Sequence, residues 1–253
     1  MKIITCLNLL FLFSLFPLPG AAGAGPADKP AAADALLNSP TLDMPQARQA
    51  LALYEELLSS AGDRRGPLLA RAAQACFVLG DMGPDSERQG FYDKGRGYAE
   101  RLLAEDPAGA PGHYWLALNL CGLADACGAL KGRQLLPRIL EELQKALARD
   151  EAYDHAGAHR ILGRIYFEAP RRPFSVGDLQ KSLEHLSAAV RLAPDISTNH
   201  LYLAETLIRL DRPDEARREL QQALTAPRHA VQPQGLAEDR QKARQLLAEL
   251  GGK

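Results

Sequence analysis

The sequence has almost no excess charge of either sign. Its 30 Lys and Arg residues are matched by 31 Asp and Glu residues, so that the net charge is −1. Nucleic-acid-binding domains usually carry a basic patch, and this composition predicts none. Beyond the N-terminus there is also no apolar run long enough to span a bilayer. These absences argue against a nucleic-acid partner and against a second membrane-crossing segment.

Sequence signatures of catalysis are missing as well. We find no Gly-x-Ser-x-Gly, no Walker loop, no His-Glu-x-x-His and no Gly-x-Gly-x-x-Gly between a strand and a helix. His155 and His159 would face the same way on one helix, but a metal site needs three or four ligands and no third is evident. We therefore predict a protein that is not an enzyme and has no cofactor and no metal. A metal-dependent enzyme that uses the two histidines is the least favoured alternative.

Residues 1–24 have the pattern of a secretory signal peptide. Lys2 precedes an apolar run from Ile3 to Phe16, and Ala22-Gly23-Ala24 supplies small residues for cleavage. The run is short for a membrane span, although an uncleaved anchor is the alternative. No cysteine stands at the cleavage point, so the usual lipoprotein signal is missing. We predict a periplasmic or secreted protein.

Three cysteines remain after that segment, at Cys76, Cys121 and Cys127. An odd number in an exported protein permits at most one internal disulfide. All three lie in apolar helical patterns, which favours small buried core residues. A Cys76–Cys121 or Cys76–Cys127 bridge is the alternative, because exported proteins meet an oxidising compartment.

From Met44 onward the sequence reads as a series of amphipathic helices. Residues 25–40 are rich in Ala and Pro and predict a flexible lead-in, and residues 41–253 predict one helical domain. Apolar residues recur at helical spacing, and no alternating run of strand length occurs, so the predicted fold class is all-α. Residues 236–250 are charged, as is typical of a C-terminal capping helix.

Small residues recur in these helices at the spacing of a 34-residue repeat. When Ser197 is counted as first, Ala204, Ala216 and Ala223 fall at the eighth, twentieth and twenty-seventh places. This pattern resembles the tetratricopeptide repeat (TPR), whose helical hairpins stack into an α-solenoid with a concave, partner-binding face. Three earlier units fit with longer loops between their helices or with a more degenerate pattern; they contain "HRILGRIYF", "YWLALNL" and "ARAAQACFVLG".

The segment Tyr166–Asp178, "YFEAPRRPFSVGD", interrupts the unit that contains "HRILGRIYF", which is the third along the chain. Pro170 ends one helix, and Asp178 suits the N-cap of the next. A mobile linker would not need two prolines and an aromatic residue. We therefore predict an ordered loop from Pro170 to Gly177 over the rim of the groove, with Phe174 packed on apolar surface.

Together with "AGAHRILGR" before it and "LEHLSAAVRLAPDISTNHLYLAE" after it, this segment is similar to the TatT component associated with TRAP-type transporters. The resemblance extends over residues 66–226 and is most specific at 155–205. It implies a periplasmic helical protein that works with a solute-binding protein, and an association with ligand handling and oligomeric assembly. Members of that group are often lipoproteins, and the missing lipoprotein signal puts membrane tethering of this chain in doubt.

The inner helices of the repeats supply the candidate binding groove. Arg160 and Arg164 lie one turn apart in places that face the concave surface, and arginine matches a carboxylate through paired hydrogen bonds. An exposed Arg164–Glu168 ion pair is the alternative explanation. We expect apolar walls from Tyr114 and Phe167. The full set of expected groove residues is Tyr114, Arg160, Arg164, Phe167, Glu168, Glu205 and Arg209.

The sequence thus predicts an exported binding or scaffold protein. The favoured partner is a periplasmic solute-binding protein of a TRAP-type transporter. A small acidic ligand, or the carboxylates of a partner, would contact the two arginines. A general TPR adaptor in an envelope protein complex is the alternative, and self-association into a homo-oligomer stays open.

Overall fold

The computed structural model describes residues 29–60, 62, 65–171, 173–230 and 235–251. Within these residues the regular structure is helical apart from two isolated bridges, so the all-α prediction is confirmed. The predicted signal peptide, residues 1–24, lies outside the described residues. The helices are α1 (Lys29–Leu37), α2 (Met44–Ser60), α3 (Arg65–Met82), α4 (Asp85–Glu105), α5 (Ala110–Ala126), α6 (Ala129–Arg149), α7 (Tyr153–Glu168), α8 (Leu179–Leu192), α9 (Ser197–Arg209), α10 (Pro213–Thr225) and α11 (Gly235–Gly251).

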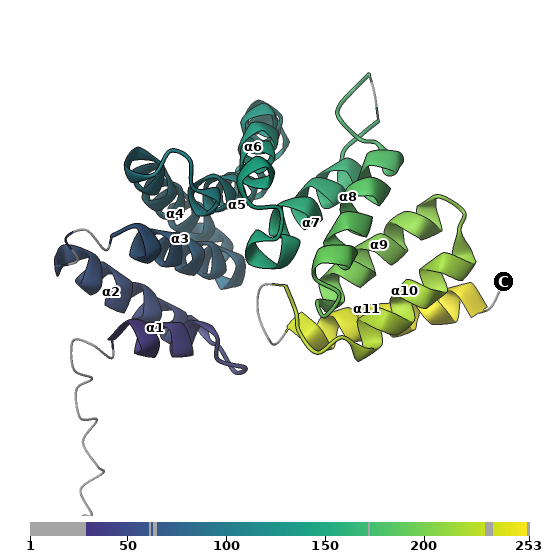
Figure 1. Ribbon diagram of the computed structural model, residues 1–253, viewed down its shortest axis with the longest axis horizontal. Helices are drawn as coiled ribbons and strands as arrows, with labels where there is room; N and C mark the ends of the chain where they lie inside the picture. The colour runs from purple at the N-terminus through teal and green to yellow at the C-terminus, as the bar shows by residue number, and fades with distance from the viewer. Residues whose placement is uncertain (1–28, 61, 63–64, 172, 231–234, 252–253) are drawn as a thin grey trace, which may run out of the picture.

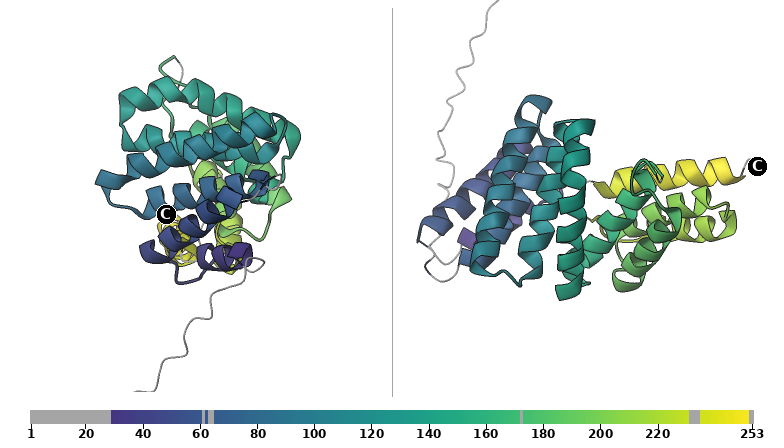
Figure 2. Two further views of the ribbon diagram at one scale, coloured as in Figure 1. Left: turned by 90° about the vertical axis from the view of Figure 1, so that its left-hand side faces the viewer. Right: turned by 90° about the horizontal axis from the view of Figure 1, so that it is seen from above.

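Successive helices pair into hairpins, and the hairpins follow one another along the molecule in chain order (Figure 1). The view from above shows the same progression, from the purple and blue helices at one end to the yellow α11 at the other (Figure 2, right). Each helix packs mainly against its sequence neighbours. This is the arrangement of a helical solenoid, in which a hairpin buries its apolar face only by stacking on the next.

Small residues lie where the paired helices meet. Ala204 on α9 and Ala216 and Ala223 on α10 are all fully buried, as the repeat spacing predicts. At Gly163 on α7, an added Cβ would stand 2.5 Å from Leu186 on α8. A larger side chain at such a place would force the two helices apart, so the small residues set the spacing of each hairpin.

The buried residues form two main clusters. The larger runs from α1 to the middle of α7, where Ala158 and Leu162 complete it. The second is made by α8, α9, α10 and α11. Packing between α6 and α7 is much less extensive than between α4 and α5. Helix α7 is therefore the element through which the two parts of the solenoid are joined.

Part of the expected lead-in is ordered, which differs from the prediction. Residues Lys29–Leu37 form α1, whose Ala33 and Leu37 are buried. The hydroxyl of Tyr54 on α2 donates to Asp34 at 2.6 Å. The alanine-rich segment is a good helix former, and it covers an apolar face of α2 that would otherwise meet water.

The three cysteines of the described chain are free. Cys76 is buried, Cys121 is half-buried and Cys127, just after α5, is exposed. Burial raises the pKa of the Cys76 and Cys121 thiols to about 12. None of the described helices combines the length and the apolar character of a membrane span.

Candidate functional site

Helix α7 begins with a left-handed turn. Asp154, His155 and Ala156 have φ values of 50°, 56° and 60°, and none of them is a glycine. Consecutive non-glycine residues in this region are sterically unfavourable by about 1–2 kcal/mol each and persist only where the surroundings hold them. The turn separates His155 from the regular helix that carries His159. The two histidines therefore do not share one helical face, and the expectation that they face the same way on one helix is wrong.

Buried Arg160 holds this turn. Its guanidinium is only 2% exposed. Nη1 donates to the His155 carbonyl at 3.2 Å and to Asn199 Oδ1 at 3.3 Å. Nη2 lies 3.5 Å from both Asp154 Oδ2 and the Tyr114 hydroxyl. The expectation that Arg160 faces the open groove is therefore wrong: the side chain points inward and links the turn to α5 and α9.

Tyr114 has the same inward role. It is 1% exposed, its hydroxyl donates to Asp154 at 2.5 Å, and burial raises its pKa. An added Cβ at Gly157 would stand 2.3 Å from the Tyr114 hydroxyl, which explains a glycine directly after the turn. Tyr114 thus supports the turn and does not form an exposed apolar wall.

The remaining expected groove residues do come together, on α7 and α9. Arg164 pairs with Glu168 at 2.5 Å and with Glu205. Its guanidinium lies 4.9 Å from the Phe167 ring centroid, and the Arg209 guanidinium lies 4.4 Å from the same ring. Arg209 also donates to the Phe167 carbonyl at 2.8 Å. We call Arg164, Phe167, Glu168, Tyr202, Glu205 and Arg209 the α7–α9 cluster.

Tyr202 is the member of this cluster that the sequence analysis missed. Its ring centroid lies 4.5 Å from the Arg164 guanidinium, so Arg164 contacts aromatic rings from both α7 and α9. Contacts of a cation with aromatic faces contribute about 0.5–1 kcal/mol each at exposed sites. The spacing of Tyr202 three residues before Glu205, on the same helix, was the available signal.

An apolar cavity of about 650 Å³ opens beside the α7–α9 cluster, between α5, α6 and α7. We call it the α6–α7 cleft. Arg164 and Glu168 lie at its edge, so the cleft and the cluster form one continuous surface. The cleft exists because α7 packs only sparsely on α6. Its apolar lining includes Cys121, Ala124, Leu136, Ile139, Ile161 and Ile165.

The loop between α7 and α8 borders this cleft. The Gly177 amide donates to the Pro170 carbonyl at 2.9 Å, and the Asp178 amide donates to Tyr166 at 2.9 Å. Asp178 caps α8 by accepting from the amides of Gln180 and Lys181, as predicted. Phe174 lines the cleft but is 85% exposed, so the prediction that it packs on apolar surface is wrong. Leu130, at the start of α6, is 74% exposed.

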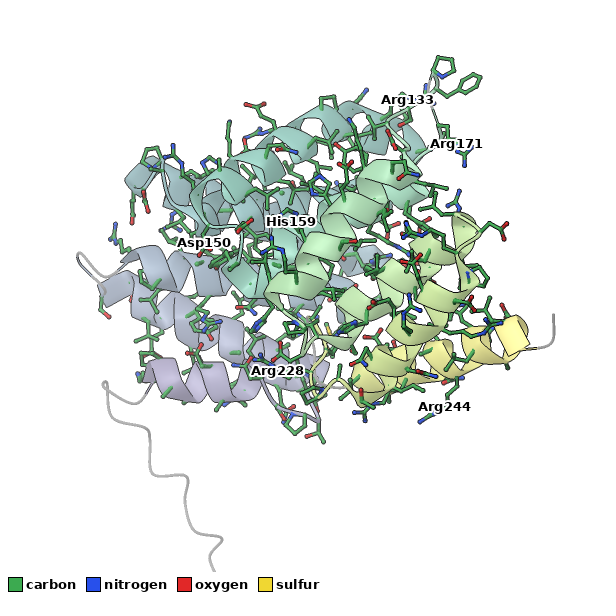
Figure 3. The ribbon with its side chains drawn as sticks, turned by 45° about the vertical axis from the view of Figure 1, so that its right-hand side comes forward. Arg133, Asp150, His159, Arg171, Arg228 and Arg244 are labelled. Carbon is green, nitrogen blue, oxygen red and sulfur yellow. The ribbon has the colours of Figure 1, made fainter. Side chains whose placement is uncertain are left out.

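His159 is paired with another histidine. Its Nδ1 lies 2.9 Å from Nδ1 of His185 on α8, and Glu151 lies 3.7 Å from its Nε2. Figure 3 marks His159 near the middle of the molecule. Burial lowers the pKa of both imidazoles, to about 4 for His185. Within the described residues, no group of three or more potential ligands is placed to hold a metal ion.

Two family models match this chain, each over more than half of its length. The TRAP transporter T-component model matches residues 109–251. The model of regulator of microtubule dynamics protein 1-3 matches residues 31–173. The two matches overlap on α5, α6 and α7, the helices that form the α6–α7 cleft. No curated protein matches.

A TPR protein is among the solved structures with a similar fold. TTC0263, a thermophilic TPR protein from Thermus thermophilus, is 20% identical with a TM-score of 0.65, and the match covers 88% of this chain and all of that one. MamA is 16% identical with a TM-score of 0.46, covering 72% of this chain and 89% of its own. At these identities the first likeness establishes the fold alone, and the second adds no argument.

Proposed function

Because the chain belongs to the TRAP transporter T-component family, and also to the family of regulator of microtubule dynamics protein 1-3, we propose from the first membership that it is an exported accessory protein that binds a periplasmic solute-binding protein. As a TPR-type member of the family it is a scaffold or accessory protein. The sequence pattern of residues 1–24 supports export. We infer the partner from the resemblance to the TatT component, which implies a protein that works with a solute-binding protein.

The observation that carries the proposal is the surface formed by the α6–α7 cleft and the α7–α9 cluster. A cleft of about 650 Å³ with an apolar lining can take one or two apolar side chains of a partner. The adjoining guanidinium groups of Arg164 and Arg209 can bind carboxylates. Protein interfaces commonly combine such an apolar anchor site with a charged rim.

Arg164 is the residue on which this surface depends. Its guanidinium forms ion pairs with two carboxylates, those of Glu168 and Glu205. Glu168 is exposed and belongs to the same helix, so a carboxylate from a partner can displace it at little cost. Phe167 and Tyr202 keep the guanidinium in place while its partners change. The same arrangement would serve a small acidic ligand.

Calorimetry with purified protein and a periplasmic solute-binding protein of a TRAP-type transporter from the same organism tests this proposal. We expect Arg164→Ala/Arg209→Ala to weaken the complex by about 10-fold or more, because each charged hydrogen bond is worth about 1.5–3 kcal/mol. The control is Arg212→Ala, which removes an exposed arginine at the N-cap of α10 whose guanidinium pairs with Glu215 of that helix. The control should bind as the wild type does.

Unchanged affinity of the double variant would refute the assignment of these residues. A second outcome, in which no solute-binding protein binds but another envelope protein binds in a manner that requires Arg164, would favour a general TPR adaptor. Ultracentrifugation of the same samples would show whether the protein self-associates.

A further inference from the structure

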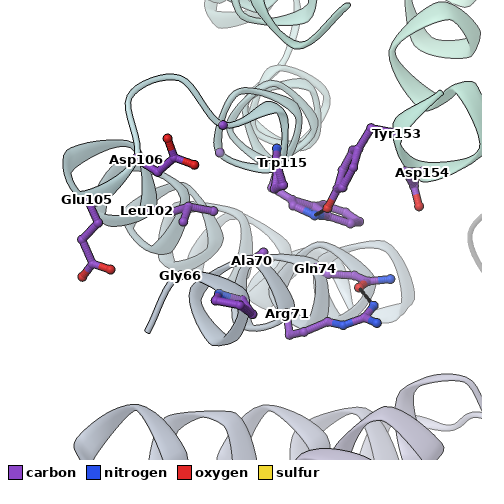
Figure 4. Close-up of a pocket in the computed structure, with 14 residues that line it drawn as sticks. Gly66, Ala70, Arg71, Gln74, Leu102, Glu105, Asp106, Trp115, Tyr153 and Asp154 are labelled. Carbon is purple, nitrogen blue, oxygen red and sulfur yellow. Dashed lines mark hydrogen bonds between the residues drawn. The ribbon is translucent and has the colours of Figure 1, made fainter. Parts of the chain in front are cut away.

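A second cavity, also of about 650 Å³, lies elsewhere in the solenoid, between α3, the end of α4, the start of α5 and the turn that begins α7 (Figure 4). We call it the α3–α5 pocket. It shares no lining residue with the α6–α7 cleft. Its volume is within the range of small-molecule sites in proteins. It has no part in the proposed function.

Aromatic rings form one side of the pocket. The indole N–H of Trp115 donates to the Tyr153 hydroxyl at 3.0 Å. Tyr114 meets both rings edge to face, with centroids 5.0 Å from Trp115 and 5.4 Å from Tyr153. Trp115 is 4% exposed, whereas Tyr153 is half-buried. The orientation of the Tyr153 ring is therefore fixed before any ligand arrives.

The charged groups around the pocket are predominantly acidic. Glu105, Asp106 and Asp154 line it, and Arg71 is the basic residue among the lining side chains. Arg71 is already engaged, because its Nε lies 3.3 Å from Asp34 and its Nη1 donates to Gln74 at 2.9 Å.

Glu105 and Asp106 are exposed at the rim and form no ion pair with the other described residues. Asp106 uses Oδ1 to accept from the Ala108 amide, at 3.2 Å, which leaves its second carboxylate oxygen available. The unpaired charge around the pocket is therefore negative.

The wall that carries Asp154 is the strained left-handed turn. Three unfavourable backbone conformations place Tyr153 and Asp154 against the pocket, and Arg160 and Tyr114 hold them there from behind. Backbone strain of this kind is found at ligand sites, where it fixes side chains in advance of binding. A regular helical start for α7 would not need a buried arginine to maintain it.

We propose that the α3–α5 pocket binds a small organic cation, namely a protonated amine on an apolar or aromatic stem. The amine would lie at the rim, beside the carboxylates of Glu105 and Asp106, which have no ion-pair partner among the described residues. The stem would pack on Ala70, Leu102 and the face of Tyr153, which attracts a cation as well as apolar surface. This inference does not depend on the identity of the protein partner.

The experiment is a titration of the full-length protein with phenethylammonium, followed by calorimetry and by the fluorescence of Trp115, the one tryptophan of the chain. Phenylacetate, with the same ring and the opposite charge, is the comparison probe. We expect phenethylammonium to saturate with a Kd of about 1 mM or tighter and phenylacetate to bind at least about 10-fold more weakly.

Variants locate the site. Glu105→Gln/Asp106→Asn removes two rim charges and keeps the ability of position 106 to accept the Ala108 amide. It should weaken phenethylammonium binding by at least about 5-fold without changing the melting temperature. The control, Glu184→Gln/Asp214→Asn, removes the same net charge from exposed positions on α8 and α10 and should bind normally.

Three results would overturn the inference: no saturation by phenethylammonium up to about 10 mM, equal affinity for phenylacetate, or equal affinity of the rim variant and the control. The solute-binding protein is absent from these titrations. Their failure therefore leaves the proposed partner interaction standing, and the reverse is also true.

Discussion

At the scale of single residues, Arg160 and Arg164 show how differently two arginines one turn apart can be used. Arg160 is buried beneath the left-handed turn, whereas Arg164 is partly exposed between Phe167 and Tyr202. Replacing a buried, hydrogen-bonded charge leaves its partners unsatisfied, and here those partners include the strained Asp154. The first arginine therefore maintains structure, and the second remains available to a partner.

We predict that Arg160→Ala lowers the free energy of unfolding by about 3–5 kcal/mol, because it leaves the buried amide oxygen of Asn199 without its donor and the partly buried carboxylate of Asp154 without its cationic partner. Arg164→Ala should cost about 1 kcal/mol, as expected for partly exposed ion pairs and aromatic contacts. Urea denaturation followed by circular dichroism measures both. Similar losses in the two variants would contradict the structural role given to Arg160.

The repeat spacing predicted that Arg164, Phe167, Glu168, Glu205 and Arg209 share one side of the inner helices, and the structure brings these five side chains together on α7 and α9. It failed for Arg160. Sequence spacing assumes a regular helix, and the turn at Asp154–Ala156 is irregular. The residue types at these three positions do not predict a left-handed turn, because none of them is a glycine.

At the scale of the elements, one hydrogen-bonded pair recurs in the α5–α6 and α9–α10 hairpins. His113 on α5 bonds Glu142 on α6 at 2.6 Å and the Pro107 carbonyl at 3.1 Å. His200 on α9 bonds Glu219 on α10 at 2.7 Å and the Pro194 carbonyl at 2.8 Å. Each histidine lies six residues after its proline.

The intervening α7–α8 hairpin departs from this pattern. His159 occupies the corresponding place on α7, but its partner on α8 is His185, where the other hairpins have glutamate. Two imidazoles can share one proton between facing nitrogens, but both cannot be protonated without repulsion. Lys181 and Arg191 add positive charge nearby, and Glu151 at 3.7 Å offsets it only in part.

The different partners of His185 and His200 predict opposite effects of pH on the stability of the folded protein. Burial, with His159 and Lys181 nearby, lowers the pKa of His185 to about 4, below the ordinary 6.5. The unfolded chain then binds more protons than the folded one between pH 6.5 and 4, so stability falls as the pH falls through that window. For His200, burial lowers the pKa but the bonds to Glu219 and the Pro194 carbonyl raise it overall. The stability that protonated His200 contributes is present at low pH and is lost as the pH rises through its raised pKa.

We therefore predict that His185→Glu stabilises the protein at pH 5 by about 1–2 kcal/mol relative to the wild type, because it gives His159 the carboxylate partner found in the neighbouring hairpins. The gain should shrink as the pH approaches 8. Thermal unfolding at pH 5, 6.5 and 8 measures it. His185→Gln serves as the control, since it keeps a hydrogen bond without the charge; an equal gain in that variant would contradict the electrostatic explanation.

The loop from Pro170 to Gly177 could be predicted only in part from the sequence. Its ends were predictable, because proline stops a helix and aspartate caps one, and both effects are local. The position of Phe174 was not, because an aromatic side chain packs only where tertiary structure offers a surface. The chain places it at the edge of the α6–α7 cleft instead.

At the scale of the whole molecule, the solenoid is divided in its packing. The larger core cluster ends within α7 and the smaller one begins at α8, while α6 and α7 pack only sparsely. In a stack of repeats each hairpin is stabilised mainly by its neighbours, so a weak contact between two hairpins lowers the cooperativity of the whole. The four hairpins from α3 to α10 were readable from the sequence; the α1–α2 hairpin and the weakness of this one contact were not.

We predict that urea unfolding is not a single transition. Loss of helix measured by circular dichroism should begin at lower urea than the change in Trp115 fluorescence, because Trp115 belongs to the larger cluster and the smaller one unfolds first. The two curves recorded on the same samples decide the matter. If they superimpose and fit one transition, the two parts unfold as a unit.

The accessibility of the cysteines determines where a label can be attached to observe the binding of a partner. Cys127 is exposed at the end of α5, next to the start of α6 and near the mouth of the α6–α7 cleft, while the pKa of the other two described thiols is raised to about 12. A maleimide dye at neutral pH should therefore attach to Cys127 first, without any engineered site. Trp115 lies on the same rigid helix, about 18 Å away at 1.5 Å per residue, and gives an internal reference for energy transfer. Transfer from the Cys127 dye to a labelled solute-binding protein would then report, in real time, a partner arriving at the cleft.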